Sequence, residues 1–366
     1  MLTRRKFLTS GLIAGVAEIS LSRTFGLEEK NRATEVVRAV YLPSGRMNSR
    51  PPLFTLLDQT EVNAAVFNLK DDGGEVNAKD RHKRWVQSLK DRGAYVIGRV
   101  VVFHDNVYAK KNPKVVLQSK GNPGEPWRDG MRWIWIDPLS EEYLEYLVKV
   151  AREGIRMGCD ELNFDYIRFP SPVDGDTKDI LFPLFNRSGY SKREVMRRFY
   201  EGLTKELYGQ TYSGSSVLLS ADIFGFVFLA GAIESIGQNL EDQAEFFDLL
   251  CPMAYPSHWD CGFFQQTDPT YAPYEVYKQT IKRGQEYLRA RDRAVKIRPW
   301  IQAFSIRNIC VDQKKCKPGC GTIKVVYDRA KFREQIKAIE DSGLRYGWMA
   351  WNPGAEYPLN LFNPKR

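Results

Sequence analysis

Two segments of the sequence end in carboxylates that could do acid/base chemistry. In the first, Cys159–Pro170, polar and apolar residues alternate as they do along a strand. Glu161, Asn163 and Asp165 fall on one face, which costs desolvation energy unless these groups are paired or have a function. The second segment, Val217–Asp222, also ends in an acid. Two acids at the ends of two strands suggest catalysis on a bond such as a glycoside.

These segments belong to a regular alternation of strand-like and helical patterns. The eight expected strands are Val37–Pro43, Ala64–Leu69, Tyr95–Phe103, Glu161–Ile167, Val217–Phe224, Leu249–Tyr255, Ile297–Phe304 and Tyr346–Trp351. Alternation predicts an α/β protein with a parallel sheet, and eight repeats favour a closed (β/α)8 barrel over a doubly wound sheet. The first strand–helix turns also lack the glycine-rich motifs that bind phosphates. We expect a single barrel domain over residues 36–366.

Local signals predict where several helices begin and end. Ser191 and Glu194 form a capping-box pattern for a helix that runs to about Leu207. Ser140 can cap another helix that stops at Gly158. The long connections, at residues 105–138, 170–190, 256–272 and 305–326, all follow strands. They therefore lie on the face where barrel enzymes keep their active sites.

The expected strand ends are rich in polar and aromatic residues, which in a barrel converge on one bowl. Aromatic rings can stack on the C–H faces of sugars, while amides, imidazoles and charged groups bind hydroxyls. The candidate substrate-binding residues are Lys70, Asp71, His104, Arg168, Tyr255, His258, Trp259, Trp300, Gln302, Trp351 and Asn352. Asp71 and Asp72 could bind substrate or a cation, but a tight turn before two glycines is the favoured interpretation of this pair.

Asp165 is the candidate nucleophile or base, and Asp222 is the candidate acid. We expect Arg168 or Lys70 to keep Asp165 ionised. The alternatives are a structural Asp–Arg pair for the first acid and a loop-bracing role for the second. Glu161 lies deeper in the expected barrel.

For Glu161, a structural ion pair with Arg99 or Arg298 is the expectation. The three histidines, His82, His104 and His258, do not lie at metal-ligand spacing. We therefore predict neither a metal nor another cofactor. The sequence also lacks the G-x-S-x-G elbow of an esterase.

The charge distribution and the N-terminal residues indicate which partners the protein binds and where in the cell it is located. The net charge is +9, of which the first 26 residues carry +3 (four cations and one anion) and the remainder +6. The remaining basic residues are scattered, so a solvated surface is favoured over a nucleic-acid site. Arg4 and Arg5 precede a short apolar stretch, which predicts a twin-arginine-type export signal over residues 1–27. We expect a periplasmic or secreted protein with no membrane span in its barrel, although an uncleaved N-terminal anchor stays open.

The chain has six cysteines. Cys159 and Cys251 lie in apolar strand-like runs and are expected to be buried thiols. Cys261, Cys310, Cys316 and Cys320 lie in loops, where one or two disulfides would fit an oxidising compartment. A zinc site is the competing interpretation.

The sequence resembles a known family in several of these motifs. Residues Asp160–Pro170 match a D-E-[IL]-x-F-D-Y-[IV]-R-F-P signature of a bacterial and archaeal family described as a "putative glycosyl hydrolase domain". The other matches are Asn68–Gly74, Gly98–Val100, Trp133–Pro138, Ser220–Gly225, Pro252–Trp259 and Arg298–Phe304, and the likeness extends from about Val37 to Pro353. The cysteine-bearing segment Asn308–Thr322 lies outside these motifs.

The resemblance implies a barrel related to amylase-type and polygalactosaminidase-like hydrolases. In such barrels a nucleophilic Asp ends the fourth strand, which points to Asp165, and the acid follows on the fifth or sixth strand, which points to Asp222. Amylase-type enzymes carry Glu as the acid, and this chain departs from them there. The sequence thus predicts a glycoside hydrolase acting on a polysaccharide or oligosaccharide. The alternatives are a non-catalytic carbohydrate-binding barrel and a metal-dependent deacetylase or other metal hydrolase.

Overall fold

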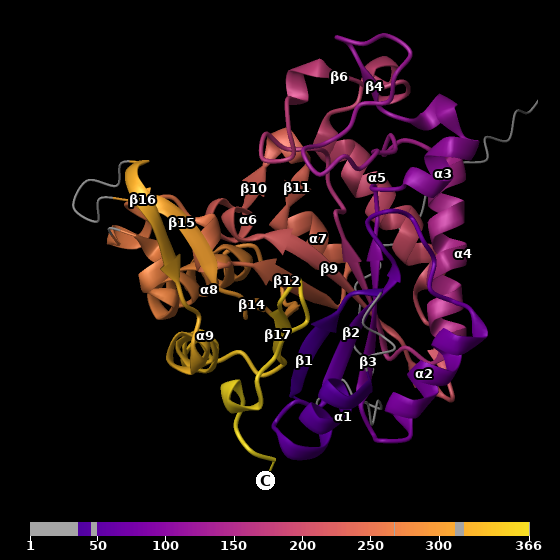
Figure 1. Cartoon of the computed structure of the whole chain (residues 1–366). Coiled ribbons are helices and arrows are strands. Elements are labelled where there is room, and N and C mark those ends of the chain that lie inside the picture. The colour runs from indigo at the N-terminus through magenta and orange to yellow at the C-terminus, as the bar shows by residue number, and fades with distance from the viewer. Residues whose placement is uncertain (1–35, 45–49, 267, 312–317, 366) are drawn as a thin grey trace, which may run out of the picture. The chain divides into compact units, whose positions relative to one another are not determined.

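The computed structural model describes residues 36–44, 50–266, 268–311 and 318–365, and within them eight parallel strand positions form a closed ring (Figure 1). In order around the ring they are β1 (Val37–Leu42), β2 (Ala64–Lys70), β3 (Tyr95–Val101), β5 (Glu161–Asp165), β9 (Leu218–Phe224), β12 (Leu249–Met253), β13 with β14 (Lys296–Ile297 and Trp300–Gln302), and β17 (Gly347–Trp351). The ring closes because β17 pairs with β1 and β9 pairs with β12. The predicted (β/α)8 barrel is confirmed.

Helices follow the strands and pack outside the ring. They are α1 (Arg50–Gln59), α2 (Asp80–Lys90), α3 (Asn106–Lys111), α4 (Glu141–Met157), α5 (Lys192–Leu207), α6 (Gly225–Ala230), α7 (Leu240–Phe246), α8 (Pro273–Arg289) and α9 (Arg329–Asp341). The predicted caps are confirmed: Ser191 and Glu194 form the capping box of α5, and Ser140 caps α4. Gly158 ends α4 in the left-handed conformation that glycine adopts readily, at φ 99°.

Two apolar clusters hold the barrel together. The larger one lies between the strands and the helices and contains Leu162 and Phe164 of β5. The smaller one fills the interior of the ring with residues such as Val66, Ile97 and Met349. The alternation along β5 therefore turns Glu161, Asn163 and Asp165 inward, as the pattern predicted.

The loops after β3 and β5 are long and meet each other. The first contains α3, a 3₁₀ turn at Pro113–Val115 and the short strand β4 (Gln118–Ser119), and the second contains β6 (Ile180–Leu181). β4 and β6 pair antiparallel (Figure 1). Three further short hairpins are β7 (Thr211–Tyr212) with β8 (Ser215–Ser216), β10 (Ala232–Ile233) with β11 (Gln238–Asn239), and β15 (Ile306–Val311) with β16 (Pro318–Val325). The β3 and β5 loops form one side of the barrel mouth.

Some expectations fall on residues outside the described ranges, among them the export signal of residues 1–27. Cys159 and Cys251 are buried free thiols, as predicted. Cys261 is disulfide-bonded. The side chains of Cys310, Cys316 and Cys320 lie outside the described residues. No helix within the described ranges is long and apolar enough to cross a bilayer.

Gly347 lies where the barrel closes, and we expect Gly347→Ala to destabilise the fold by more than about 3 kcal/mol. Gly347 has φ 82°, and a Cβ there would lie 1.8 Å from the carbonyl oxygen of Val37 on β1. Gly343→Ala is the matched control, because φ is 76° but nothing lies within 4 Å, so only about 1–2 kcal/mol of backbone strain is expected. Urea unfolding of both variants checks this. Equal losses would contradict the close contact.

Candidate active site

Asp165 ends β5 at the mouth of the barrel and is held by a buried arginine. Arg99 of the neighbouring strand β3 donates from both Nε, at 3.0 Å, and Nη2 to Asp165 Oδ2. Arg99 Nη1 donates to Asn68 Oδ1 at 2.8 Å, which fixes the guanidinium. Hydrogen bonds between a guanidinium and a carboxylate are strong and directional, so they fix the position of the Asp165 side chain.

The backbone after Asp165 takes a conformation that is rare for a bulky residue. Tyr166 has φ 51°, in the left-handed region. This turn points the Tyr166 N–H at Asp165 Oδ1, at 2.7 Å. Both carboxylate oxygens of Asp165 thus accept hydrogen bonds, which fixes the orientation of the side chain.

Asp222 lies on the next strand, on the same side of the sheet. β5 and β9 pair Phe164 with Ala221, so Asp165 and Asp222 are the next residues along each strand. Neighbouring strands are about 4.8 Å apart, which brings the two acids side by side inside the barrel. Asp222 Oδ1 accepts hydrogen bonds from Asn163 Nδ2 at 2.9 Å and Trp300 Nε1 at 2.7 Å.

The environment of Asp222 favours its protonated form. The side chain is 1% exposed, and its Oδ2 has no hydrogen-bond partner among the described residues. Burial raises the pKa of Asp222 well above its ordinary value, and the nearby charge of Asp165 raises it further. An acid whose surroundings favour the protonated form therefore lies beside an aspartate that is hydrogen-bonded to arginine.

Aromatic residues form the walls around these acids. Trp351, at the end of β17, stacks on Tyr41 with ring centroids 4.1 Å apart and is only partly buried. Trp300 meets Trp351 edge-on at 5.8 Å. Burial raises the pKa of Tyr255 well above its ordinary value, and Tyr277, Asp222 and Asp165 raise it further. Three of the predicted aromatic residues thus surround the two acids.

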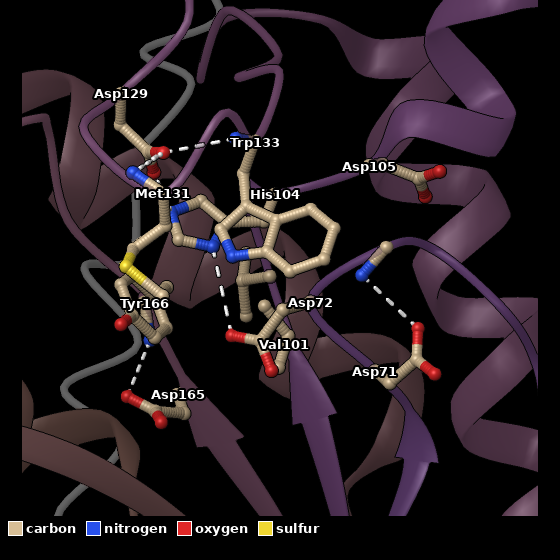
Figure 2. A network of polar contacts seen from close by, with 12 residues as sticks. Asp71, Asp72, Val101, His104, Asp105, Asp129, Met131, Trp133, Asp165 and Tyr166 are labelled. Atoms are coloured by element: carbon tan, nitrogen blue, oxygen red, sulfur yellow. Dashed lines mark hydrogen bonds and ion pairs between the residues drawn. The ribbon is translucent and has the colours of Figure 1, made fainter. Parts of the chain in front are cut away.

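Asp72 is a further acid at the mouth, for which the sequence favoured a turn role. Its Oδ2 lies 3.7 Å from Arg99 Nη1, and its Oδ1 lies 3.7 Å from His104 Nδ1 (Figure 2). Burial alone would raise the pKa of Asp72, but Arg99 and His104 lower it well below the ordinary range. Burial lowers the pKa of His104, so this imidazole is neutral at neutral pH.

Lys70 and Arg168 do not contact Asp165, which corrects the expectation that they keep it ionised. A β-bulge after Asn68 turns the fully buried Lys70 away from the ring interior. Its Nζ instead donates to the carbonyl oxygens of Val101 and His104, at 2.8 and 2.6 Å. Arg168 forms a two-point ion pair with Asp174, at 2.7 and 3.0 Å. Arg99 has the role expected of them, and Glu161 pairs with Arg298.

Asp71 takes the turn role that the sequence favoured for the pair. Its Oδ1 accepts from the N–H groups of Gly73 and Glu75, at 3.1 and 3.0 Å. In Figure 2 its side chain points away from the Asp165 group. Of the two consecutive aspartates, only Asp72 extends toward Arg99.

Four other predicted residues form contacts within the loops or lie at the rim of the barrel. Gln302 is fully buried and accepts from the Ser257 N–H at 3.2 Å. Asn352 donates to the carbonyl oxygen of Ala303 at 2.8 Å. Trp259 is buried in a cluster of phenylalanines, whereas His258 is exposed beside Tyr255. Contact of these four residues with a substrate stays a prediction.

The residues missed by sequence reasoning are Arg99 as the partner of Asp165, together with Asn68 and Tyr41, whereas Asp72 was considered and assigned to a turn. An arginine within the apolar run Tyr95–Phe103 was the available signal, because a buried charge requires a partner. Within the described part of the chain, no three His, Cys, Asp or Glu side chains are grouped so that they could hold a metal ion.

The geometry can be compared with known proteins. Residues 39–357 match the family described as "Putative glycosyl hydrolase domain". The chain belongs to this family. A search of curated proteins finds no significant match.

Solved structures share the barrel of the family. The PgaB (BpsB) glycoside hydrolase domain from Bordetella bronchiseptica is 16% identical, with 90% of this chain and 100% of that one covered and a TM-score of 0.57. A mutant GH18 chitinase from Cycas revoluta in complex with (GlcNAc)4 is 11% identical, with 87% and 96% covered and a TM-score of 0.53. At these identities the likeness establishes the fold.

A third structure is more similar in sequence over a shorter region. It is a hypothetical protein from Ruminiclostridium thermocellum that is 30% identical, with 50% of this chain and 96% of that one covered and a TM-score of 0.40. The family match supports a glycoside hydrolase.

Proposed function

We propose that this chain cleaves a glycosidic bond in a polysaccharide, with Asp222 as the general acid and Asp165 as the base or nucleophile. One observation supports this most: two adjacent carboxyl groups are held in different environments, one paired with an arginine and the other buried with no positive charge bonded to it. Arg99 and the Tyr166 N–H donate hydrogen bonds to Asp165, whereas burial raises the pKa of Asp222 and so favours its protonated form. Glycoside hydrolysis requires one acid to protonate the leaving oxygen and one carboxylate on the other side.

The surroundings fit a sugar substrate in an exported enzyme. The partly exposed Trp351 offers a flat ring at the mouth, beside Tyr255 and Trp300. A periplasmic or secreted location is proposed from Arg4 and Arg5 in the first residues. The disulfide-bonded Cys261 supports an oxidising compartment.

Release of new reducing ends tests the proposal. Purified protein is incubated with peptidoglycan, chitin, chitosan and amino-sugar exopolysaccharides, with boiled enzyme as the control. Reducing ends from at least one polymer are expected. A non-catalytic carbohydrate-binding barrel is the second candidate. The observation that favours it is that Oδ2 of Asp222, which has no hydrogen-bond partner among the described residues, is buried from the solvent through which a substrate would arrive. That protein would bind a polymer in a pull-down without releasing reducing ends.

Trp351→Ala is expected to raise KM about tenfold and to change kcat less. The reason is the loss of a stacking surface, which is worth about 1 kcal/mol or more. Trp351→Phe keeps a ring against Tyr41 and serves as the control, with KM within about threefold of wild type. Initial rates over a range of polymer concentrations provide both constants. An unchanged KM in Trp351→Ala would show that this ring does not contact the substrate.

A further inference from the structure

His104 is a buried imidazole whose two nitrogens face two carboxylates. It is 1% exposed, packed between the rings of Trp135 and Tyr166 at 4.3 and 3.9 Å. Its Nδ1 lies 3.7 Å from Asp72 Oδ1 and its Nε2 lies 3.4 Å from Asp129 Oδ2, both longer than a hydrogen bond. A buried polar group without a hydrogen bond is costly, so this arrangement requires an explanation.

The two carboxylates differ in how they are held. Asp129 has three donors: the N–H groups of Met131 and Trp133, both at 2.9 Å (Figure 2), and Trp135 Nε1 at 3.1 Å. Asp72 has no donor at hydrogen-bond distance among the described residues, only the long contacts to Arg99 and His104. A neutral imidazole carries one N–H. Because Asp129 already accepts three hydrogen bonds, the imidazole proton stabilises the structure more on Nδ1, where it faces Asp72.

Of the three residues Asp72, His104 and Arg99, Asp72 is the most exposed to solvent. Its side chain is 28% exposed, whereas those of His104 and Arg99 are 1% and 2% exposed. Arg99 lies between Asp72 and Asp165 and contacts both. An ionised carboxylate beside the catalytic pair, with free acceptor positions toward the mouth, can bind a hydroxyl or N–H donor of a sugar.

We propose that Asp72 is a third functional carboxylate, which binds a donor group of the sugar next to the scissile bond, and that His104 is a positioning residue that orients Asp72 through Nδ1. This rests on the proposed function and adds to it a role for two residues outside the acid/base pair. Hydrogen bonds in active sites are often long before substrate binds and shorten in the complex, which accounts for the 3.7 Å separation. Sugar hydroxyl contacts that strengthen in the transition state add to catalysis by glycosidases.

Four variants test the two roles. Asp72→Asn removes the charge and is expected to lower kcat/KM by about 10- to 100-fold, the range for a hydrogen bond to a charged group. His104→Asn places an amide N–H near the position of Nδ1, whereas His104→Gln places it near Nε2. His104→Asn should therefore keep kcat/KM within about threefold of wild type, and His104→Gln should lose about tenfold. Asp80→Asn, at the exposed start of α2, is the charge-matched control.

Kinetics are measured on the same four polymers, peptidoglycan, chitin, chitosan and amino-sugar exopolysaccharide, with Asp165→Asn as the inactive reference. Thermal unfolding of each variant identifies losses of activity that are caused by a loss of stability. Both His104 variants lose the same ring contacts, so a difference in activity between them reports on the position of the N–H group. Wild-type kcat/KM in Asp72→Asn, alongside an inactive Asp165→Asn, would overturn this proposal and leave the proposed function intact. His104→Gln equal to or better than His104→Asn would overturn the role of Nδ1. A wild-type protein that cleaves none of the polymers would overturn the proposed function first, and this inference with it.

Discussion

Asp165→Asn is expected to lower kcat by about a thousandfold or more while the barrel stays folded. The amide cannot act as a nucleophile or base, and such groups contribute about 10²- to 10⁴-fold to a rate. Arg99 would lose its main partner but would still contact Asn68 and Asp72, so we expect stability to fall by no more than about 3 kcal/mol. Reducing-end assays and circular dichroism measure the two effects separately.

Glu161→Gln is the matched control for this prediction. Glu161 lies four residues earlier on β5, faces the same interior and forms a buried ion pair with Arg298. Removing one partner of such a pair costs about 3–5 kcal/mol, so this variant should be the less stable of the two. Its kcat should stay within a few-fold of wild type. A similar loss of kcat in both variants would mean that broken ion pairs, and not the chemistry of Asp165, explain the result.

Asp222→Asn is expected to lower kcat by about 10²- to 10⁴-fold without destabilising the protein at neutral or alkaline pH. The amide oxygen can still accept from Asn163 and Trp300, so both hydrogen bonds of the wild-type side chain are kept. Only the transferable proton is lost. A loop-bracing residue would give the opposite pattern, with lower stability and retained activity.

The pH dependence of stability provides a second readout for Asp222. Its pKa is raised above the ordinary 3.8 in the folded state, so the folded protein holds this proton at pH values where the unfolded chain has released it. Stability contributed by this group therefore falls as pH rises from about 3.8 toward the raised pKa, by up to about 1.4 kcal/mol per pH unit. Asparagine does not ionise, so Asp222→Asn should gain stability relative to wild type over this window.

Urea unfolding of wild type and Asp222→Asn from pH 4 to pH 8 tests this prediction. The difference in unfolding free energy should move in favour of the variant as pH rises. A difference that moves toward the wild type would mean that the ionised carboxylate stabilises the fold, and the assignment of Asp222 as a buried acid would be wrong. Asp165→Asn should also lower the pKa of Asp222, because the charge of Asp165 is one of the causes that raise it.

The positions of the strands and helix ends could be predicted because they depend on local patterns. Alternation in Glu161–Ile167 identified both the strand and its inward face, and capping residues such as Ser191 identified helix starts. The C-terminal ends of the strands were also correctly expected to bring Asp165 and Asp222 to one place, since all parallel strands end on the same face.

Partners across the sheet were harder to predict, because they depend on register and on irregular backbone. The bulge after Asn68 reverses the direction of Lys70, and simple alternation cannot show this. The left-handed Tyr166 ends the alternation of β5, so Arg168 is directed to Asp174. The register between β3 and β5 places Arg99 opposite Asn163, two residues from both Glu161 and Asp165, so strand pairing alone does not choose between the two acids. In the structure Arg298 pairs with Glu161, and Arg99 pairs with Asp165.

The most direct test of the account is a crystal structure of Asp222→Asn with an oligosaccharide from the polymer that the wild type cleaves. The account predicts a glycosidic oxygen within hydrogen-bond distance of the residue 222 side chain and the adjoining anomeric carbon next to Asp165. A sugar bound in the mouth with its glycosidic bonds away from both side chains would contradict the assignment of these two residues as the catalytic pair.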